Sequence, residues 1–360
     1  MKNELISSIP EDSSAKFVSG LDALYYFVKL NYDDYTLFYN NYLLKYYLDS
    51  VDSLQLCNNQ IIGSQWYRFE YSIDIDSEGL CPNMKKLCKI GFKNLNRNDN
   101  NESIEIQMYT STMNHIGYKK SVQLVNDFLI TLGLEPLATK ISRVDLNTYV
   151  LGHNFENITY FDFSTKAKVS NPISKAGVLE TFYLGKSTTD SVQLKIYNKN
   201  KELHVLANSN HDESNFKYFL IKMRFLMKYS KSIDIRDNLW NIEFKVRRGT
   251  LRRYKIDSVE DLFNNVDSIH KDIVNNTFRM LETKKKNKNN QRVENHHIWK
   301  SIESEFKIFH EPIPIDKEKL KLYKKDRIWF KNRMIDFIEE SRNENDPMLE
   351  DIKSLLSKYS

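Results

Sequence analysis

Three short stretches of the chain alternate apolar and polar residues with a period of two, and this alternation constrains the fold more than any other feature. The stretches are residues 142–150, 192–197 and 239–247. Side chains two positions apart on a β-strand point to the same side, so each stretch predicts a strand with one apolar and one polar face. A solvated sheet face explains any one of these strands alone, whereas the three together favour a polar cleft.

The polar faces of these strands carry acids, cations and phenols. In chain order they hold Arg143, Asp145, Asn147, Tyr149, Gln193, Lys195, Tyr197, Asn241, Glu243, Lys245 and Arg247. Such side chains bind cations and phosphates or transfer protons. Periodicity alone assigns no role to any of them.

Further strand and helix patterns alternate between about residues 17 and 283. Strands are predicted at 66–74, 87–92, 104–109 and 181–184, and helices at 33–49, 118–132, 213–229 and from Ser258 onward. Strand–helix–strand units recur twice, which indicates two pseudo-equivalent halves. We therefore expect an α+β fold: an antiparallel sheet with helices packed on one face, followed by a helical C-terminal appendage.

Composition divides the chain into four predicted parts. Residues 1–16 form a flexible leader, 17–283 the main domain, 284–295 a basic linker or loop, and 296–360 the helical appendage. A run of lysines and asparagines at 284–290 is typical of a solvated segment. The adjacent His296 and His297 would point to opposite sides of a strand, and we interpret them as surface residues of low functional weight.

Cysteine content and hydropathy exclude several protein classes. The chain has 360 residues, of which 41% are apolar, enough to bury a core. Its three cysteines form no C-x-x-C pair, so a disulfide framework and a cysteine-based zinc site are not expected. No run of about 18 apolar residues occurs, and we expect a cytoplasmic protein that does not enter membranes.

Charge is distributed unevenly along the chain. Residues 1–80 contain 5 Lys or Arg and 12 Asp or Glu, whereas residues 221–330 contain 26 and 16. A basic half behind an acidic leader is typical of a polyanion-binding protein. The alternative is the lysine- and asparagine-rich coding bias of an AT-rich genome.

Several segments together resemble a known motif series. They read SGLDALY at 19–25, SRVD at 142–145, YLGKS at 183–187, KIYNKNKE at 195–202 and WNIEFKVRR at 240–248. The series is that of trans-acting replication initiation factors of rolling-circle plasmids, phages and integrative elements, which the related relaxases share. The resemblance covers roughly residues 17–270, and the Tyr-Asn-Lys-x-x-Glu element is its most specific part.

The resemblance implies a DNA strand-nicking and joining endonuclease. Tyr197 occupies the position of the nucleophile, which becomes linked to a 5′ phosphate and leaves a 3′ hydroxyl as primer. A phenol with a pKa of about 10 needs activation, for which Lys195 and Lys199 are candidates. A tyrosine on a half-buried strand is the ordinary alternative.

A divalent cation, Mg²⁺ or Mn²⁺, is the implied cofactor because hard oxygen ligands suit these ions. Asp145 and Glu243 match the family's acidic positions, with Glu202 a third candidate ligand. Each acid has an alternative as an ordinary cross-strand ion pair with Arg143 or Arg247.

The implied partner is origin DNA, single-stranded or supercoiled, with a host helicase and a second copy of the chain as further candidates. The residues expected to contact DNA are Arg143, Lys186, Arg247, Arg248, Arg252 and Arg253. Three rivals remain open: a conjugative relaxase of the same chemistry, an origin-binding protein that does not cut, and an RNA-binding sheet protein. The last is weakened because no aromatic RNP-like strand motif occurs.

Three departures from the family pattern stand out. Tyr149 occupies the position of a second acid four residues after Asp145, so this strand lacks the second carboxylate of the family pattern. Lys195 replaces the usual arginine two residues before the tyrosine, which keeps the charge but loses bidentate phosphate geometry. No His-hydrophobic-His metal motif occurs.

Overall fold

The chain is described by a computed structural model, which covers residues 15–40, 54–56, 66–74, 84–95, 103–188, 191–209, 211–229, 235, 238–283 and 293–308. These residues all fall in the first of two compact units, Met1–Ile313. Residues 1–14 of the expected leader, most of the basic linker and the tail beyond residue 308 lie outside the described residues, whereas Lys16 already belongs to the first strand. The predicted domain boundaries therefore stay predictions.

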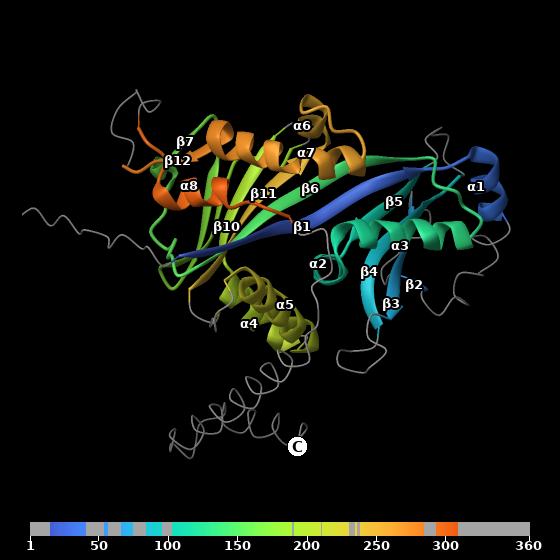
Figure 1. Cartoon of the computed structure of the whole chain (residues 1–360), viewed down its shortest axis with the longest axis horizontal. Helices are drawn as coiled ribbons and strands as arrows, with labels where there is room; N and C mark the ends of the chain where they lie inside the picture. Colours follow the sequence, from blue (N-terminus) through green and yellow to red (C-terminus); the bar gives the residue numbers. More distant parts are fainter. Residues whose placement is uncertain are drawn as a thin grey trace, which may run out of the picture. The chain divides into compact units, whose positions relative to one another are not determined.

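Within the described residues, ten strands form one antiparallel sheet (Figure 1), in the order β2-β3-β4-β5-β1-β6-β11-β10-β9-β8. The strands are β1 Lys16–Lys29, β2 Leu54–Leu56, β3 Trp66–Asp74, β4 Met84–Lys93, β5 Ser103–Met108, β6 Ala138–Leu151, β8 Ser170–Lys175, β9 Val178–Leu184, β10 Val192–Asn198 and β11 Leu239–Arg247. Two further strands, β7 Phe163–Thr165 and β12 Phe278–Met280, pair separately. The predicted antiparallel sheet is confirmed.

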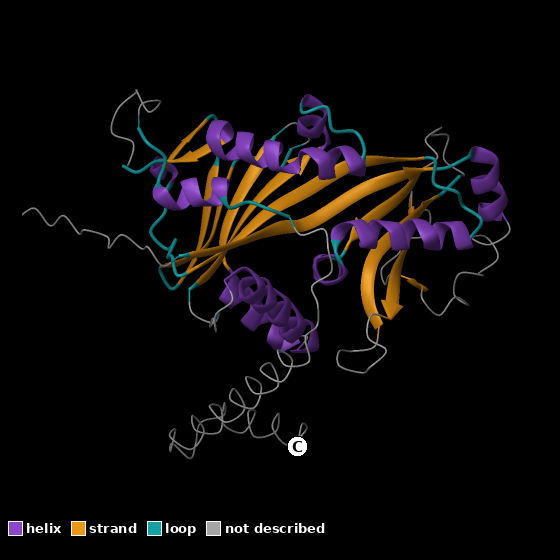
Figure 2. Ribbon diagram, in the orientation of Figure 1, coloured by secondary structure: helices purple, strands orange, loops and turns teal. Residues whose placement is uncertain are grey.

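Helices connect and cover the strands (Figure 2). They are α1 Tyr32–Phe38, α2 Thr110–Ile116, α3 Tyr118–Thr131, α4 Lys199–Ser209, α5 His211–Tyr229, α6 Arg248–Arg253, α7 Val259–Asp272 and α8 His297–Ser304. Ser258 and Asp261 form a capping box at the start of α7, as their spacing predicts. Helix α1 is capped instead by Asn31, whose side chain accepts a hydrogen bond from Asp33 N.

The sheet is built from two halves with the same order of elements. Each half begins with a strand of 14 residues, β1 or β6, which pair with each other at the centre of the sheet. A hairpin follows, β3–β4 or β9–β10, and then a strand that returns beside the long one, β5 or β11. Each half closes with a helix of 14 residues, α3 or α7. The topology thus contains the two pseudo-equivalent halves that the sequence pattern indicates.

One side of the sheet, here called the core face, carries the apolar residues of the alternating strands. Val144, Leu146 and Val150 of β6 lie on it, fully buried, together with Phe244 of β11. Helices α3 and α7 pack on this face and join the same apolar cluster. Burying this face supplies the hydrophobic free energy that holds helices and sheet together.

The opposite side of β6 and its neighbours, here called the polar face, is also covered by helices. Helices α4 and α5 pack over one end of it (Figure 1), where a second apolar cluster includes Val18, Tyr149, Leu151 and Phe225. Helices therefore cover both faces rather than the single face expected. The reason is that the polar face turns apolar toward the end of the strands, at Leu151 and Leu239, and this end needs cover.

Helix α8, part of the expected appendage, packs on the core face. Trp299 is fully buried there, 6.0 Å from the ring of Phe244, and its indole nitrogen donates a 2.6 Å hydrogen bond to Phe278 O. This contact places the start of the appendage against the same core as the main domain. Among the described helices, none is long and apolar enough to cross a membrane.

A histidine in the middle of this core makes folding stability depend on pH. His270 is buried between Phe306, 3.7 Å away, and Phe244, 5.5 Å away, and neither ring nitrogen has a hydrogen-bond partner among the described residues. Burial lowers the pKa of His270 to about 3. The unfolded chain takes up this proton below about pH 6.5, so unfolding binds a proton and stability falls as pH drops from 6.5 toward 3.

Below pH 6.5 we expect the free energy of unfolding of His270→Phe to fall less steeply with decreasing pH than that of wild type, by roughly 1 kcal/mol per pH unit. The measurement is urea unfolding of both proteins at pH values between 7 and 4. His204→Phe on the exposed surface of α4 is the matched control. An identical pH slope in wild type and His270→Phe would contradict the assignment.

Candidate active site

Strand register brings the three predicted polar faces together. Strand β6 pairs with β11 so that Asn147 lies opposite Glu243, and β11 pairs with β10 so that Glu243 lies opposite Lys195 and Asn241 opposite Tyr197. Directly opposed residues point to the same side of a sheet. Asp145, Glu243 and Tyr197 therefore share the polar face on three adjacent strands.

The hydroxyl of Tyr197 lies inside a hydrogen-bond network. Asn241 Nδ2 donates to it at 2.8 Å and Lys199 Nζ at 3.3 Å, while Asn147 Nδ2 donates to Asn241 Oδ1 at 3.2 Å. Lys195 Nζ stands 3.8 Å from the centre of the Tyr197 ring. Both predicted lysine partners are thus in contact with the tyrosine, one at its hydroxyl and the other over its ring.

Lys199 is held by Glu202. Its ammonium contacts both carboxylate oxygens, at 2.9 and 3.0 Å, because the two residues face each other one turn apart at the start of α4. Burial raises the pKa of Glu202, but the charge and hydrogen bond of Lys199 outweigh burial, so the pKa is lowered. Glu202 is thus the ion-pair partner of Lys199, and it lines the same pocket as Asp22.

Tyr197 is neutral in this arrangement. Only 5% of the residue is exposed, and burial raises the pKa of its phenol well above 10, with the acids Asp22, Glu202 and Glu243 adding to the shift. Because neighbouring negative charge opposes the phenolate, additional positive charge would lower this pKa.

Two buried acids lie next to the tyrosine. Asp145 and Glu243 are 1% and 6% exposed, and burial followed by the charges of Asp22 and Asp145 raises the pKa of Glu243 well above its ordinary value. Arg143 forms an ion pair with Asp145, its Nε donating to Oδ1 at 2.8 Å, and leaves Glu243 without an equivalent partner among the described ion pairs.

These acids fit a hard divalent cation by chemistry. Oxygen ligands are what Mg²⁺ and Mn²⁺ require, and the carboxyl groups of Glu243 and Asp145 are close enough to share a proton. The raised pKa favours the protonated form of Glu243, so a bound cation would displace this proton. Asp22 adds a third acid from β1, where a register shift between Leu21 and Ala23 turns the strand. Metal binding here would compete with the Arg143 ion pair.

Cations line the adjacent part of the polar face. Arg143 and Arg247 lie directly opposite each other on β6 and β11, and Lys245 stands opposite Asp145. Burial and then the charge of Arg143 lower the pKa of Lys245. Clustered cations of this kind favour a bound anion such as a phosphate.

The remaining residues expected to contact DNA have different surroundings. Lys186 and Arg252 are exposed, and Arg253 Nη2 donates to Thr250 Oγ1 at 3.0 Å. Arg247 donates to Ser187 Oγ at 3.1 Å. Arg248 is bound to the carbonyls of Ile141 and Ile256 and to Asp257, so it fastens the segment after α6 to β6.

Three residues of the site have no assigned role in the sequence interpretation. A pocket lies between the polar face, α2 and α5, and its lining includes Asp22, Tyr149, Lys199 and Arg224. Asp22 belongs to the SGLDALY motif, but nothing in the sequence indicates the register shift in β1 that exposes its side chain to this pocket. Asn241 and Lys245 alternate visibly with the apolar residues of their strand, and this alternation is the signal that identifies them.

Comparisons with known proteins add little. No family profile matches the chain, and no curated protein matches it. Among solved structures, the chain is similar to a rolling circle replication initiator protein from Geobacillus stearothermophilus, with 11% identity and a TM-score of 0.41 over 82% of this chain and 100% of that chain. At this TM-score the similarity carries no argument about this chain.

Gly20 has no side chain, and this allows the buried side chains of Tyr118 and Arg224 to pack directly against the backbone of β1. A Cβ atom at this position would lie 2.4 Å from Tyr118 Oη and 2.5 Å from Arg224 Nη2. We expect Gly20→Ala to destabilise the protein by about 1–3 kcal/mol, because a packed core resists added volume. Urea unfolding measures this change. The loss should be smaller in a Tyr118→Phe background, and equal losses in both backgrounds would contradict the clash with the hydroxyl.

Proposed function

We propose that this protein is a rolling-circle replication initiator that nicks and rejoins one DNA strand through Tyr197. The observation that carries the proposal is the convergence on one sheet face of a phenol, its lysine partner Lys199 and the acids Asp145 and Glu243. The motif resemblance supports the same assignment independently of the contacts. A relaxase of an integrative element would use the same chemistry at another DNA site.

In the proposed reaction Tyr197 Oη attacks a backbone phosphorus atom of the DNA. A new O–P bond forms, the bond from phosphorus to the 3′ oxygen breaks, the phenol loses its proton, and the 3′ oxygen gains one. The product is a 5′-phosphotyrosine, which retains the bond energy needed to rejoin the strand. Lys199 stabilises the phenolate that develops, and Asn241 orients the hydroxyl.

The acids Asp145 and Glu243, with Asp22, are the proposed ligands of Mg²⁺ or Mn²⁺. A divalent ion bound there supplies a Lewis acid that polarises the scissile phosphate. Arg143, Lys245 and Arg247 extend the positive charge along the polar face and are suited to hold the neighbouring phosphates of the strand.

One observation favours a second candidate function, an origin-binding protein that does not cut. Tyr197 is almost completely buried and its phenol is neutral. Cleavage therefore requires that DNA and a cation gain access to a hydroxyl that is buried in this structure, whereas simple DNA binding does not. The two functions differ in whether a covalent protein–DNA product forms.

We expect Tyr197→Phe to abolish nicking, by about a thousandfold or more, while DNA affinity stays within about threefold of wild type. The assay incubates the full chain with the supercoiled plasmid or element that carries its gene, in Mn²⁺ or Mg²⁺, and follows open-circle DNA and an SDS-resistant protein–DNA adduct. Tyr183→Phe, on neighbouring strand β9 and opposite Lys195, is the matched control and should nick normally.

Two results would count against this assignment. Nicking that persists in Tyr197→Phe would show that another residue is the nucleophile. Wild-type protein that binds this DNA tightly but forms neither open circles nor adduct would favour the origin-binding function.

We expect Asp145→Asn and Glu243→Gln each to raise the Mn²⁺ concentration needed for half-maximal nicking by about 10- to 100-fold, because each removes one anionic ligand. The measurement is the nicking rate as a function of Mn²⁺ concentration. Glu180→Gln is the control. Glu180 forms an ion pair with Lys201, 3.1 Å between the charged atoms, and is not one of the proposed ligands. An unchanged Mn²⁺ requirement in both site variants would overturn their role as ligands.

A further inference from the structure

Two histidines and a glutamate meet on the part of the molecule where α8 begins. His296 is the residue that caps α8 and His297 is its first residue, so the pair lies at the start of a helix. Glu282 follows β12, and a backbone hydrogen bond of 2.9 Å from His296 N to Met280 O brings the two segments together. The helical turn, unlike a strand, allows both imidazoles to point the same way.

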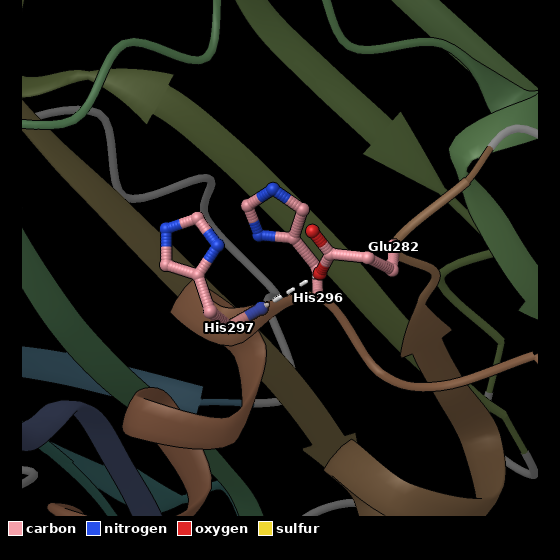
Figure 3. A group of neighbouring side chains, drawn as sticks. All are labelled: Glu282, His296 and His297. Atoms are coloured by element: carbon pink, nitrogen blue, oxygen red, sulfur yellow. Dashed lines mark hydrogen bonds between the residues drawn. The ribbon is translucent and has the colours of Figure 1, made fainter. Parts of the chain in front are cut away.

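The three side chains form a compact group. Their possible ligand atoms all lie within 4.8 Å of one another, which no other group of three His, Cys, Asp or Glu residues achieves in the described part of the chain. The two imidazole rings are 4.3 Å apart between centroids. Figure 3 shows one nitrogen of each ring turned toward the other ring, with the Glu282 carboxylate next to His296.

The side chains of His296, His297 and Glu282 make few and long hydrogen bonds to the described residues. Nε2 of His297 is buried and has no hydrogen-bond partner among the described residues. His296 Nδ1 accepts only a long hydrogen bond, 3.3 Å, from Ile298 N, and the Glu282 carboxylate accepts one of 3.2 Å from His297 N. A bound ion would replace these long contacts with stronger bonds to the same atoms.

We infer that Glu282, His296 and His297 form a binding site for a divalent transition metal, with Zn²⁺ the best fit. Imidazole and carboxylate ligands suit zinc, whereas Mg²⁺ prefers oxygen ligands alone. At a Zn–N distance of about 2.0–2.1 Å, two ligands of one tetrahedral ion stand about 3.4 Å apart, so atoms within 4.8 Å need only small side-chain rotations.

The surroundings of the group are consistent with a structural role. The ring of His153, in the loop after β6, lies 5.8 Å from that of His296 and 6.3 Å from that of His297, measured between ring centroids. A metal here joins the end of β12 to the start of α8, whose Trp299 is buried on the core face. The site is therefore separate from the acids and Tyr197 on the polar face.

The test is direct binding of Zn²⁺ to the full chain after removal of metals with a chelator. We expect one Zn²⁺ per chain in competition with a chromophoric chelator, and a melting temperature that rises on addition of Zn²⁺. His296→Ala and His297→Ala should each weaken binding by about 100-fold and remove the thermal shift. His204→Ala, an exposed histidine on α4, is the matched control and should bind as wild type does.

Substitution by Co²⁺ provides a second readout that depends on the ligands and not on stability. Wild type should give visible absorption of the kind tetrahedral Co²⁺ produces, and Glu282→Gln, which keeps the size of the side chain, should lose most of it even if an alanine variant folds poorly. The inference is overturned if wild type binds no Zn²⁺ at micromolar concentration. It is equally overturned if the histidine and Glu282→Gln variants, folded by circular dichroism, bind Zn²⁺ as tightly as wild type.

Discussion

The double pairing of β6 is the constraint on which the rest of the structure depends. This strand binds β1 on one side and β11 on the other through most of its length. Because side chains alternate, a slip of one residue would turn Asp145 and Asn147 into the core and expose Val144 and Leu146. The apolar row beneath α7 therefore holds the polar row of the site in register on the other side.

Burial gives the polar face its unusual electrostatics. Helices α4 and α5 exclude water from part of this face, so the charges there interact strongly and each must be balanced locally. Lys199 balances Glu202, and Arg143 balances Asp145. Burial and the neighbouring acids favour the protonated form of Glu243, and a bound cation would stabilise its ionised form instead. Charge balance in this region thus points to a ligand that carries positive charge.

The sequence was enough to predict which side chains share the polar face, because alternation is a local property of each strand. It was not enough to predict which residues lie opposite one another on neighbouring strands, and these neighbours determine the contacts of each site residue. Lys199 follows the strand of Tyr197 directly and reaches its hydroxyl only because α4 starts there. Glu202 is a candidate cation ligand by sequence, and only the first turn of α4 places its carboxylate against Lys199. Arg248 resembles a DNA contact in sequence, yet the carbonyls around it bind its guanidinium.

The sequence by itself determined the three alternating strands with their apolar and polar faces, the helical capping box at Ser258 and the position of Tyr197 in its motif, whereas it predicted no strand for β1 at the centre of the sheet. Each of these follows from residues within a few positions of one another. Only the tertiary structure decided that Asp22 joins the acids, that helices cover both faces, and that His296 and His297 meet Glu282. Such contacts join residues distant in sequence, and their free energy comes from burial and charge balance in the folded chain, which local patterns do not encode.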